Sequence, residues 1–191
     1  MDQEQVAEAP ARAEEAGVPV LPGRFREARV QEVPAPAPPE VAPPAPAPVP
    51  KPTDTRLLLT VPRLGLTDIT VGDSPKQSYL DREGIMHLSG TGFPFKRNSN
   101  TYIAGHAGDF GRSRIPNVFR NLNSLRQGDL IALRDANGKT YNYRVYNRLV
   151  VNPRDVWVTD PIPGKKIVSL QTCFPAPTYE KRLIVRGELV K

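Results

Sequence analysis

Short runs of β-favouring residues, separated by turn signals, occupy the chain from about residue 55 to its end. The clearest pair flanks Asn137-Gly138, a dipeptide that supplies the positive φ of a tight hairpin turn. In the second run of that pair, apolar and polar residues alternate as in a half-buried strand. In total the pattern predicts eight strands, over 56–61, 69–71, 85–88, 102–104, 130–134, 139–151, 166–173 and 182–190. One short helix or helical turn is expected over 115–126. The pattern therefore predicts an all-β sandwich or closed barrel.

The preceding part of the chain has a different composition. Thirteen of the 22 prolines lie within residues 1–55, and proline and alanine dominate 34–50. This composition predicts an extended, polyproline-like spacer. Residues 4–16 are rich in Ala and Glu, but a marginal helix without a packing partner frays. We expect a disordered linker over 1–54 and one folded domain over 55–191, which is long enough to bury a core.

The charge of the expected domain is strongly positive. Residues 56–191 carry 21 basic and 11 acidic side chains, a net charge of +10, whereas residues 1–55 carry a net charge of −4. Such a surface favours contact with polyanions, including anionic wall polymers, lipid headgroups or nucleic acid. No basic cluster is interleaved with aromatic residues that could stack on bases, so no specific nucleic-acid partner is expected.

Other classes of site have no support in the sequence. The spacing of His, Cys and Asp residues does not match a metal site, and no Gly-rich phosphate-binding loop is present. We therefore expect neither a metal nor a cofactor. No window reaches the ~18 apolar residues of a membrane span, and no signal-peptide core is present.

The only cysteine, Cys173, lies at the end of the strand-like run 166–172. A lone cysteine is most often a buried, inert residue, but a strand end beside a proline-containing loop favours a functional role. If residues 174–181 reverse the chain, Cys173 and Arg182 lie at the same end of an antiparallel pair, where facing residues are ~5 Å apart. His106 ends a third strand-like run. A thiol, an imidazole and a guanidinium at strand ends can support acyl transfer.

Three motifs resemble the signatures of the sortases, the cysteine transpeptidases of mainly Gram-positive bacteria. They are Gly105-His106 after a strand, Leu170-Gln171-Thr172-Cys173 closing another, and Glu180-Lys181-Arg182 opening the last. The resemblance extends from about Leu57 to Val190 with the motifs in the family's order. The family usually has Thr where Ser169 stands, a change that keeps a hydroxyl. The surroundings of the cysteine are most similar to those of classes D and E. The resemblance implies an eight-stranded sortase-type β-barrel with one or two short helices.

The resemblance also implies roles for individual residues. Cys173 would be the nucleophile, attacking as the thiolate. His106 would be the general acid and base, and Arg182 would stabilise the oxyanion or hold substrate carbonyls. Substrate contacts are expected from Thr172 and Phe174 beside the cysteine and from Trp157 in the proline-containing loop 152–165.

Other residues compete for some of these roles. His87 could replace His106, but only Gly105-His106 matches the family signature. Arg186 shares the strand parity of Arg182, but it lies four residues farther on, ~13 Å along the strand. Asp109 could orient His106 or could serve the turn in which it lies.

The implied activity is cleavage of a Leu-Pro-x-Thr-Gly-like sorting signal between Thr and Gly through a thioacyl intermediate on Cys173. An amine acceptor, either a peptidoglycan peptide or a pilin lysine, would then take the acyl group, so that surface proteins are anchored to the wall or pilins are joined. The implied location is extracytoplasmic, at the cell surface, with membrane association through an anchor absent from this sequence. Two alternatives remain: a thiol peptidase or amidase that uses water, and a non-enzymatic basic β-barrel that binds wall polymers.

Overall fold

The computed structural model describes residues 52–108 and 113–190, which all belong to the unit Ala47–Lys191. Most of the linker predicted over 1–54 lies outside the described residues, as does Asp109. The boundary expected at residue 55 therefore stays a prediction.

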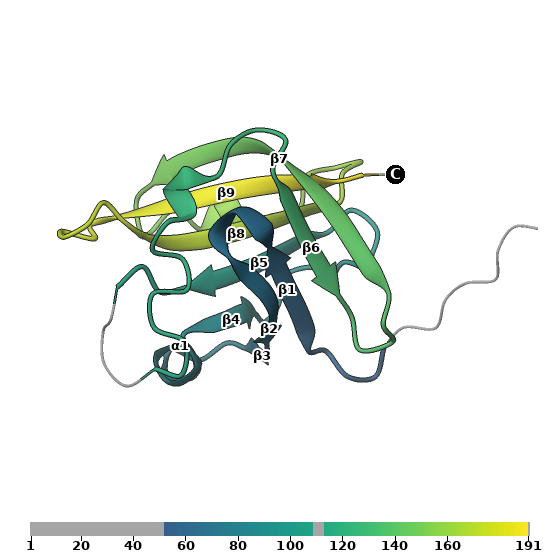
Figure 1. Ribbon diagram of the computed structural model, residues 1–191. Coiled ribbons are helices and arrows are strands. Elements are labelled where there is room, and N and C mark those ends of the chain that lie inside the picture. Colours follow the sequence, from purple (N-terminus) through teal and green to yellow (C-terminus); the bar gives the residue numbers. More distant parts are fainter. Residues whose placement is uncertain (1–51, 109–112, 191) are drawn as a thin grey trace, which may run out of the picture. The chain divides into compact units, whose positions relative to one another are not determined.

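Nine strands form one sheet within the described residues, in the order β2-β1-β6-β7-β9-β8-β5-β4-β3. The strands are β1 (Leu57–Val61), β2 (Leu66–Val71), β3 (Asp73–Ser74), β4 (Ile85–Leu88), β5 (Asn100–Gly105), β6 (Leu130–Arg134), β7 (Thr140–Val151), β8 (Ile167–Phe174) and β9 (Lys181–Leu189). The sheet curls into a nearly closed barrel, with β2 approaching β4 (Figure 1). The all-β barrel is confirmed. The strand beyond the eight expected is β3, a two-residue strand at one edge of the sheet.

Both predicted antiparallel pairs are present. β6 and β7 form a hairpin around Gly138, whose φ of 80° is the positive value expected at its turn. β8 and β9 pair along their whole length. β5 and β8 pair in parallel, and no local sequence signal predicts this pairing. This crossover makes β8 the central strand of the trio β5, β8 and β9 (Figure 1).

The core fills the inside of the barrel. In β7, Tyr141, Tyr143 and Val145 are buried and the residues between them are exposed, as the alternation predicted. Phe119, from the chain after β5, is fully buried in the same cluster. Each large apolar side chain buried in this way contributes roughly 1.5–3 kcal/mol relative to exposure.

The short helix or helical turn expected over 115–126 is present in part. Residues 115–126 contain turns and one 3₁₀-helix, η2 (Leu122–Ser124), rather than an α-helix. Asn117 has a φ of 60°, in the left-handed region, which interrupts a helix there. The α-helix in the described residues is α1 (Gln77–Glu83), which buries only Leu80 and ends at Gly84 with a φ of 86°. Because only one of its residues is buried, α1 lacks the apolar periodicity from which a helix is predicted.

Candidate active site

The three candidate catalytic residues lie at or just beyond the ends of three neighbouring strands, on the same side of the sheet. In the β8–β9 pair, Cys173 lies opposite Arg182. On its other side, β8 runs parallel to β5, and their last paired residues are Ala104 and Gln171. His106, one residue beyond the end of β5, and Cys173 each follow those partners by two residues, so an extension of this register predicts that they are neighbours. At the strand spacing of about 4.8 Å, the register therefore predicts one short row of three backbones.

A buried hydrogen bond maintains this register next to the row. Thr172 Oγ1 donates to the Gly105 carbonyl at 2.8 Å. The bond joins β8 to β5 one residue before both Cys173 and His106. Thr172 also lines the cavity described next. Its hydroxyl is thus engaged in holding the strands together, while its position still borders the space expected for substrate.

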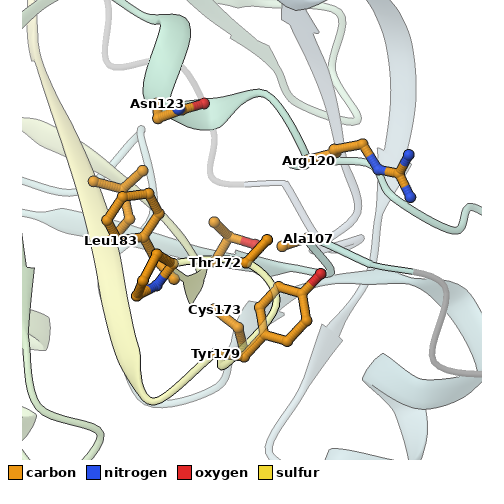
Figure 2. Close-up of a pocket in the computed structure, with 10 residues that line it drawn as sticks. Ala107, Arg120, Asn123, Thr172, Cys173, Tyr179 and Leu183 are labelled. Atoms are coloured by element: carbon orange, nitrogen blue, oxygen red, sulfur yellow. The ribbon is translucent and has the colours of Figure 1, made fainter.

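Cys173 is partly exposed and lines a cavity of about 480 Å³. Figure 2 shows side chains that line this cavity, and they come from the segment after β5, the end of β8, the β8–β9 loop and β9. The lining is Ala107, Arg120, Asn123, Thr172, Cys173, Phe174, Pro175, Ala176, Tyr179 and Leu183. A thiol at the wall of an open cavity is accessible to a peptide-sized reactant.

His106 is held by its backbone on both sides. Its N–H donates to the Gly84 carbonyl at 3.0 Å, at the end of α1, and its carbonyl accepts from the Phe119 N–H at 2.9 Å. The residue is 8% exposed. Its Nε2 lies 4.0 Å from the Asp81 carboxylate, at the outer limit of an ion pair. His106 is therefore largely buried, its Nε2 lies on the side of α1, and the residue lies outside the lining of the Cys173 cavity.

Arg182 is partly buried, and its guanidinium is fixed by the chain around it. Nη1 donates to the carbonyls of Tyr179 at 3.2 Å and Lys181 at 3.0 Å. A guanidinium keeps a permanent charge and directed donors, and Arg182 lies opposite Cys173 in the β8–β9 pair but outside the lining of the Cys173 cavity. This is the chemistry required of a group that stabilises a developing oxyanion.

Phe174 and Trp157 occupy different surroundings. Phe174 lines the Cys173 cavity and packs partly against the barrel core. Trp157 lies on the 3₁₀-helix η3 (Val156–Thr159), and 51% of it is exposed. Its neighbour Val158 is the residue of η3 that is buried. Trp157 lies outside the lining of the Cys173 cavity.

The competing residues lie elsewhere. His87 is fully buried, with Nδ1 2.8 Å from an Asp73 carboxylate oxygen and Nε2 2.9 Å from the Gly92 carbonyl, which ties β4 to β3 and to the loop after β4. Arg186 lies opposite Ser169, four residues from the Cys173–Arg182 pair. These positions favour structural roles for both.

Burial raises the pKa of the Tyr102 hydroxyl, while the positive charges of Arg186 and Arg182 act in the opposite direction. The hydroxyl donates to Gln171 Oε1 at 2.6 Å. Tyr102 therefore stays protonated at neutral pH and joins β5 to β8 near the two arginines.

Sequence reasoning missed some residues around the cysteine. Arg120 and Asn123 line its cavity, but they come from the segment predicted as helix, and no motif marks them. Asp81, whose carboxylate lies 4.0 Å from His106 Nε2, belongs to the unpredicted α1. The approach of α1 to the end of β5 is a tertiary contact without a local signal.

Residues 52–108 and 113–190 contain no group of three or more His, Cys, Asp or Glu side chains arranged to hold a metal ion. No helix in this part of the chain has the length and apolar character needed to cross a membrane.

Comparisons with known proteins agree on one family. The model of the sortase domain matches residues 59–190. The sortase SrtE1 of Streptomyces coelicolor is 31% identical over 147 residues, which cover 70% of this chain and 40% of that protein. The chain spans about 40% of the length of the curated relatives it matches.

Solved structures share the fold. Sortase C-1 from Actinomyces oris superposes with a TM-score of 0.62 at 28% identity, covering 73% of this chain and 76% of that one. Clostridium perfringens sortase C, solved with the C-terminal cell wall sorting motif, has a TM-score of 0.59 at 25% identity and covers 70% of this chain and 69% of that one.

Proposed function

This chain belongs to the sortase family, and we propose that it is a cysteine transpeptidase whose reaction is carried by Cys173, His106 and Arg182. The observation that carries the proposal is the row of these residues at the ends of three adjacent strands, with the thiol open to a cavity. A nucleophile, a proton carrier and a fixed cation are the groups that acyl transfer from a peptide requires.

The first half of the reaction forms a thioester. The Cys173 thiolate attacks the carbonyl carbon of the scissile peptide bond, and Arg182 stabilises the negative charge that develops on the carbonyl oxygen. The C–N bond then breaks, and the leaving amine takes a proton from the His106 imidazolium. The acyl group is left on the cysteine sulfur.

The second half reverses the proton transfer. An acceptor amine attacks the thioester carbonyl and gives a proton to neutral His106. The C–S bond breaks, the thiolate returns, and a new amide bond is formed. A water molecule in place of the amine would give hydrolysis, which is the alternative activity of the same groups.

The proposed donor is a Leu-Pro-x-Thr-Gly-like sorting signal, cleaved between Thr and Gly. The similarity to the Clostridium perfringens sortase C that was solved with its sorting motif supports this donor. Thr172 and Phe174 border the thiol, and exposed Trp157 offers apolar surface on the η3 loop. The proposed acceptor is a peptidoglycan peptide or a pilin lysine.

The proposed location is the extracytoplasmic surface, with membrane association. There the basic 56–191 region would also meet anionic wall polymers or lipid headgroups. The similarity to SrtE1 supports the proposed likeness to classes D and E.

The test is mass spectrometry of the full chain incubated with a Leu-Pro-x-Thr-Gly or Leu-Ala-x-Thr-Gly peptide and a glycine-type amine. We expect an acyl adduct on Cys173 and a ligated product, both absent from Cys173→Ala. Cleavage without ligation across several amines would favour the peptidase or amidase. No adduct across a panel of peptides, with salt-sensitive polymer binding retained in Cys173→Ala, would favour the binding barrel.

A further inference from the structure

One backbone carbonyl on the η3 loop accepts two hydrogen bonds from the sheet beneath it. The Val158 carbonyl accepts from Asn100 Nδ2 and from Arg186 Nη2, each at 3.0 Å. Asn100 Nδ2 also donates to the Asp160 carbonyl at 3.1 Å. The loop between β7 and β8 is therefore tied to the sheet at two points by side chains.

A third buried residue orients the amide of Asn100. Ser169 Oγ donates to Asn100 Oδ1 at 2.8 Å, and these residues are 0% and 1% exposed. Because the amide oxygen accepts from Ser169, the amide nitrogen faces the loop carbonyls. The Ser169 hydroxyl therefore stabilises the loop indirectly, through Asn100. We name Asn100, Ser169 and Arg186 the loop latch.

Arg186 is the least expected member of the loop latch. Only 6% of the residue is exposed, and it donates to a carbonyl rather than to a carboxylate. Its Nε has no hydrogen-bond partner within the described residues. Trp157, which is half exposed, lies over the guanidinium at 5.7 Å from the ring centroid. Burying a charge without an opposite charge opposes folding, so its presence here calls for a role that an apolar residue could not fill.

The loop latch lies on the same strands as the candidate catalytic row. Asn100 is on β5, Ser169 on β8 and Arg186 on β9. Ser169 and Arg186 face each other four residues from Cys173 and Arg182, roughly 13 Å along the strand. A peptide extended along β8, with its scissile bond at the thiol and its N-terminal part toward Ser169, would have the fourth residue before that bond beside η3.

We propose that the loop latch holds η3, with Trp157, in its peptide-binding position before a peptide arrives. The three residues are positioning residues, since they act through the loop and not on the reacting atoms. Val158 supplies the apolar part of the attachment by packing in one cluster with Tyr102 and Ile184. The link to peptide binding rests on the proposed function, whereas the hold on the loop does not.

Loss of the loop latch should weaken peptide binding without slowing the chemical step. A loop that is in place only part of the time reduces apparent affinity by the fraction in place. If that fraction falls to about one tenth, KM for the donor peptide rises about tenfold while kcat is unchanged.

The experiment compares Ser169→Ala and Arg186→Gln with wild type in the full chain. Ser169→Thr keeps the hydroxyl and is the conservative partner. Arg144→Gln removes an exposed arginine that bonds the Gly128 carbonyl on another face, so it is the control for charge.

The first readout needs no substrate. Hydrogen exchange of the amides in 155–162 and acrylamide quenching of Trp157 fluorescence should both increase severalfold in Ser169→Ala and Arg186→Gln. Ser169→Thr and Arg144→Gln should match wild type, and exchange in β1 and β6 should stay unchanged as a check on global folding. Unchanged loop exchange in both variants would overturn the proposal, whatever the enzyme does.

The second readout is steady-state kinetics with the donor peptide. A rise in KM with constant kcat in both variants supports the proposal, and a fall in kcat with constant KM overturns the link to peptide binding. If the loop loosens but wild type turns over no peptide, the proposed function fails while the hold of the loop latch on η3 stands.

Discussion

Cys173 and Arg182 face each other across the antiparallel pair of β8 and β9, and the arginine is anchored through one nitrogen to two backbone carbonyls at the start of β9. Both bonds use Nη1. Within the described residues, Nε and Nη2 make no hydrogen bond. The anchoring therefore fixes the guanidinium without consuming all its donors.

Arg182→Lys should show that this geometry matters in addition to the charge. A lysine keeps the positive charge but cannot both hold the two carbonyls and point a second donor at the substrate. Loss of one oxyanion donor costs roughly 100- to 1,000-fold in kcat. Peptide ligation kinetics would measure the loss, with Arg144→Lys, at an exposed β7 arginine that bonds the Gly128 carbonyl, as control. A fall of less than about threefold would remove Arg182 from the proposed chemistry.

Thr172→Val tests the bond that joins β8 to β5 beside the site. Valine has a similar shape but leaves the Gly105 carbonyl without the hydroxyl that lies at 2.8 Å. We expect a loss of about 1–2 kcal/mol in the free energy of unfolding and a lower kcat, because the register next to His106 loosens. Urea unfolding and ligation assays measure the two effects. Thr172→Ser should retain most of both, and a valine variant as stable and active as the serine variant would contradict the expectation.

The pairing of Cys173 with Arg182 could be predicted because it is local. Two strand-like runs separated by a short loop have few ways to pair, so equal steps from the turn bring these residues together. The position of His106 beside Cys173 could not be derived in this way. It depends on the parallel pairing of β5 with β8, between segments far apart in the sequence.

The same contrast between local and long-range contacts explains why the partners of buried polar groups could not be predicted. Asn100 and Ser169 are 69 residues apart in sequence, and neither has an unusual context. Sequence reasoning noted that Ser169 keeps a hydroxyl, but only the packed strands reveal what the hydroxyl binds. The short helix or helical turn expected over 115–126 is present only as turns and the 3₁₀-helix η2, since Asn117 has a left-handed φ of 60°.

Arg120→Ala should raise KM for an acceptor that carries a carboxylate and leave KM for the donor peptide unchanged. Arg120 lines the Cys173 cavity, whose lining contains no acidic side chain among the described residues, so an acceptor amine that also carries a carboxylate would be favoured there. For an exposed charge the effect is small, at most about fivefold in KM for that acceptor. When the carboxylate of that acceptor is replaced by an amide, Arg120→Ala should leave KM unchanged. Arg114→Ala, which removes an exposed partner of Glu83, is the control, and equal effects on both acceptors would contradict the role.

Ionisation of Glu83 should make part of the free energy of unfolding depend on pH in the acidic range. The hydrogen bond from Arg82 Nε, aided by the charge of Arg114, holds the pKa of this carboxyl below its ordinary value of 4.5. A lowered folded-state pKa means that the contribution is present above the unfolded-state pKa and is lost as pH falls through the folded-state pKa. Between about pH 5 and pH 3, wild type should therefore lose more stability than Glu83→Gln. Thermal unfolding at several pH values measures this, and parallel curves for the two proteins would exclude it.

Gly105→Ala should disturb the site through the core. A Cβ at this position would lie 2.5 Å from Phe119 Cδ2 and 2.8 Å from Val118 Cγ1. Phe119 is fully buried, and its N–H donates to the His106 carbonyl, so a shift of the ring displaces the proposed base as well. Overpacking of this kind costs about 1–3 kcal/mol, and we expect a lower Tm together with a lower kcat.

The second substitution Phe119→Leu separates this clash from other effects of the alanine. A smaller side chain leaves room for the added methyl group, so the double variant should be more stable than the sum of the two single losses predicts. Calorimetry of the four proteins gives the coupling free energy, and ligation kinetics show whether kcat recovers with it. Strict additivity would mean that the Gly105 requirement arises from Val118 or from the Gly105 backbone rather than from Phe119, and the link between Phe119 and the position of His106 would then be lost.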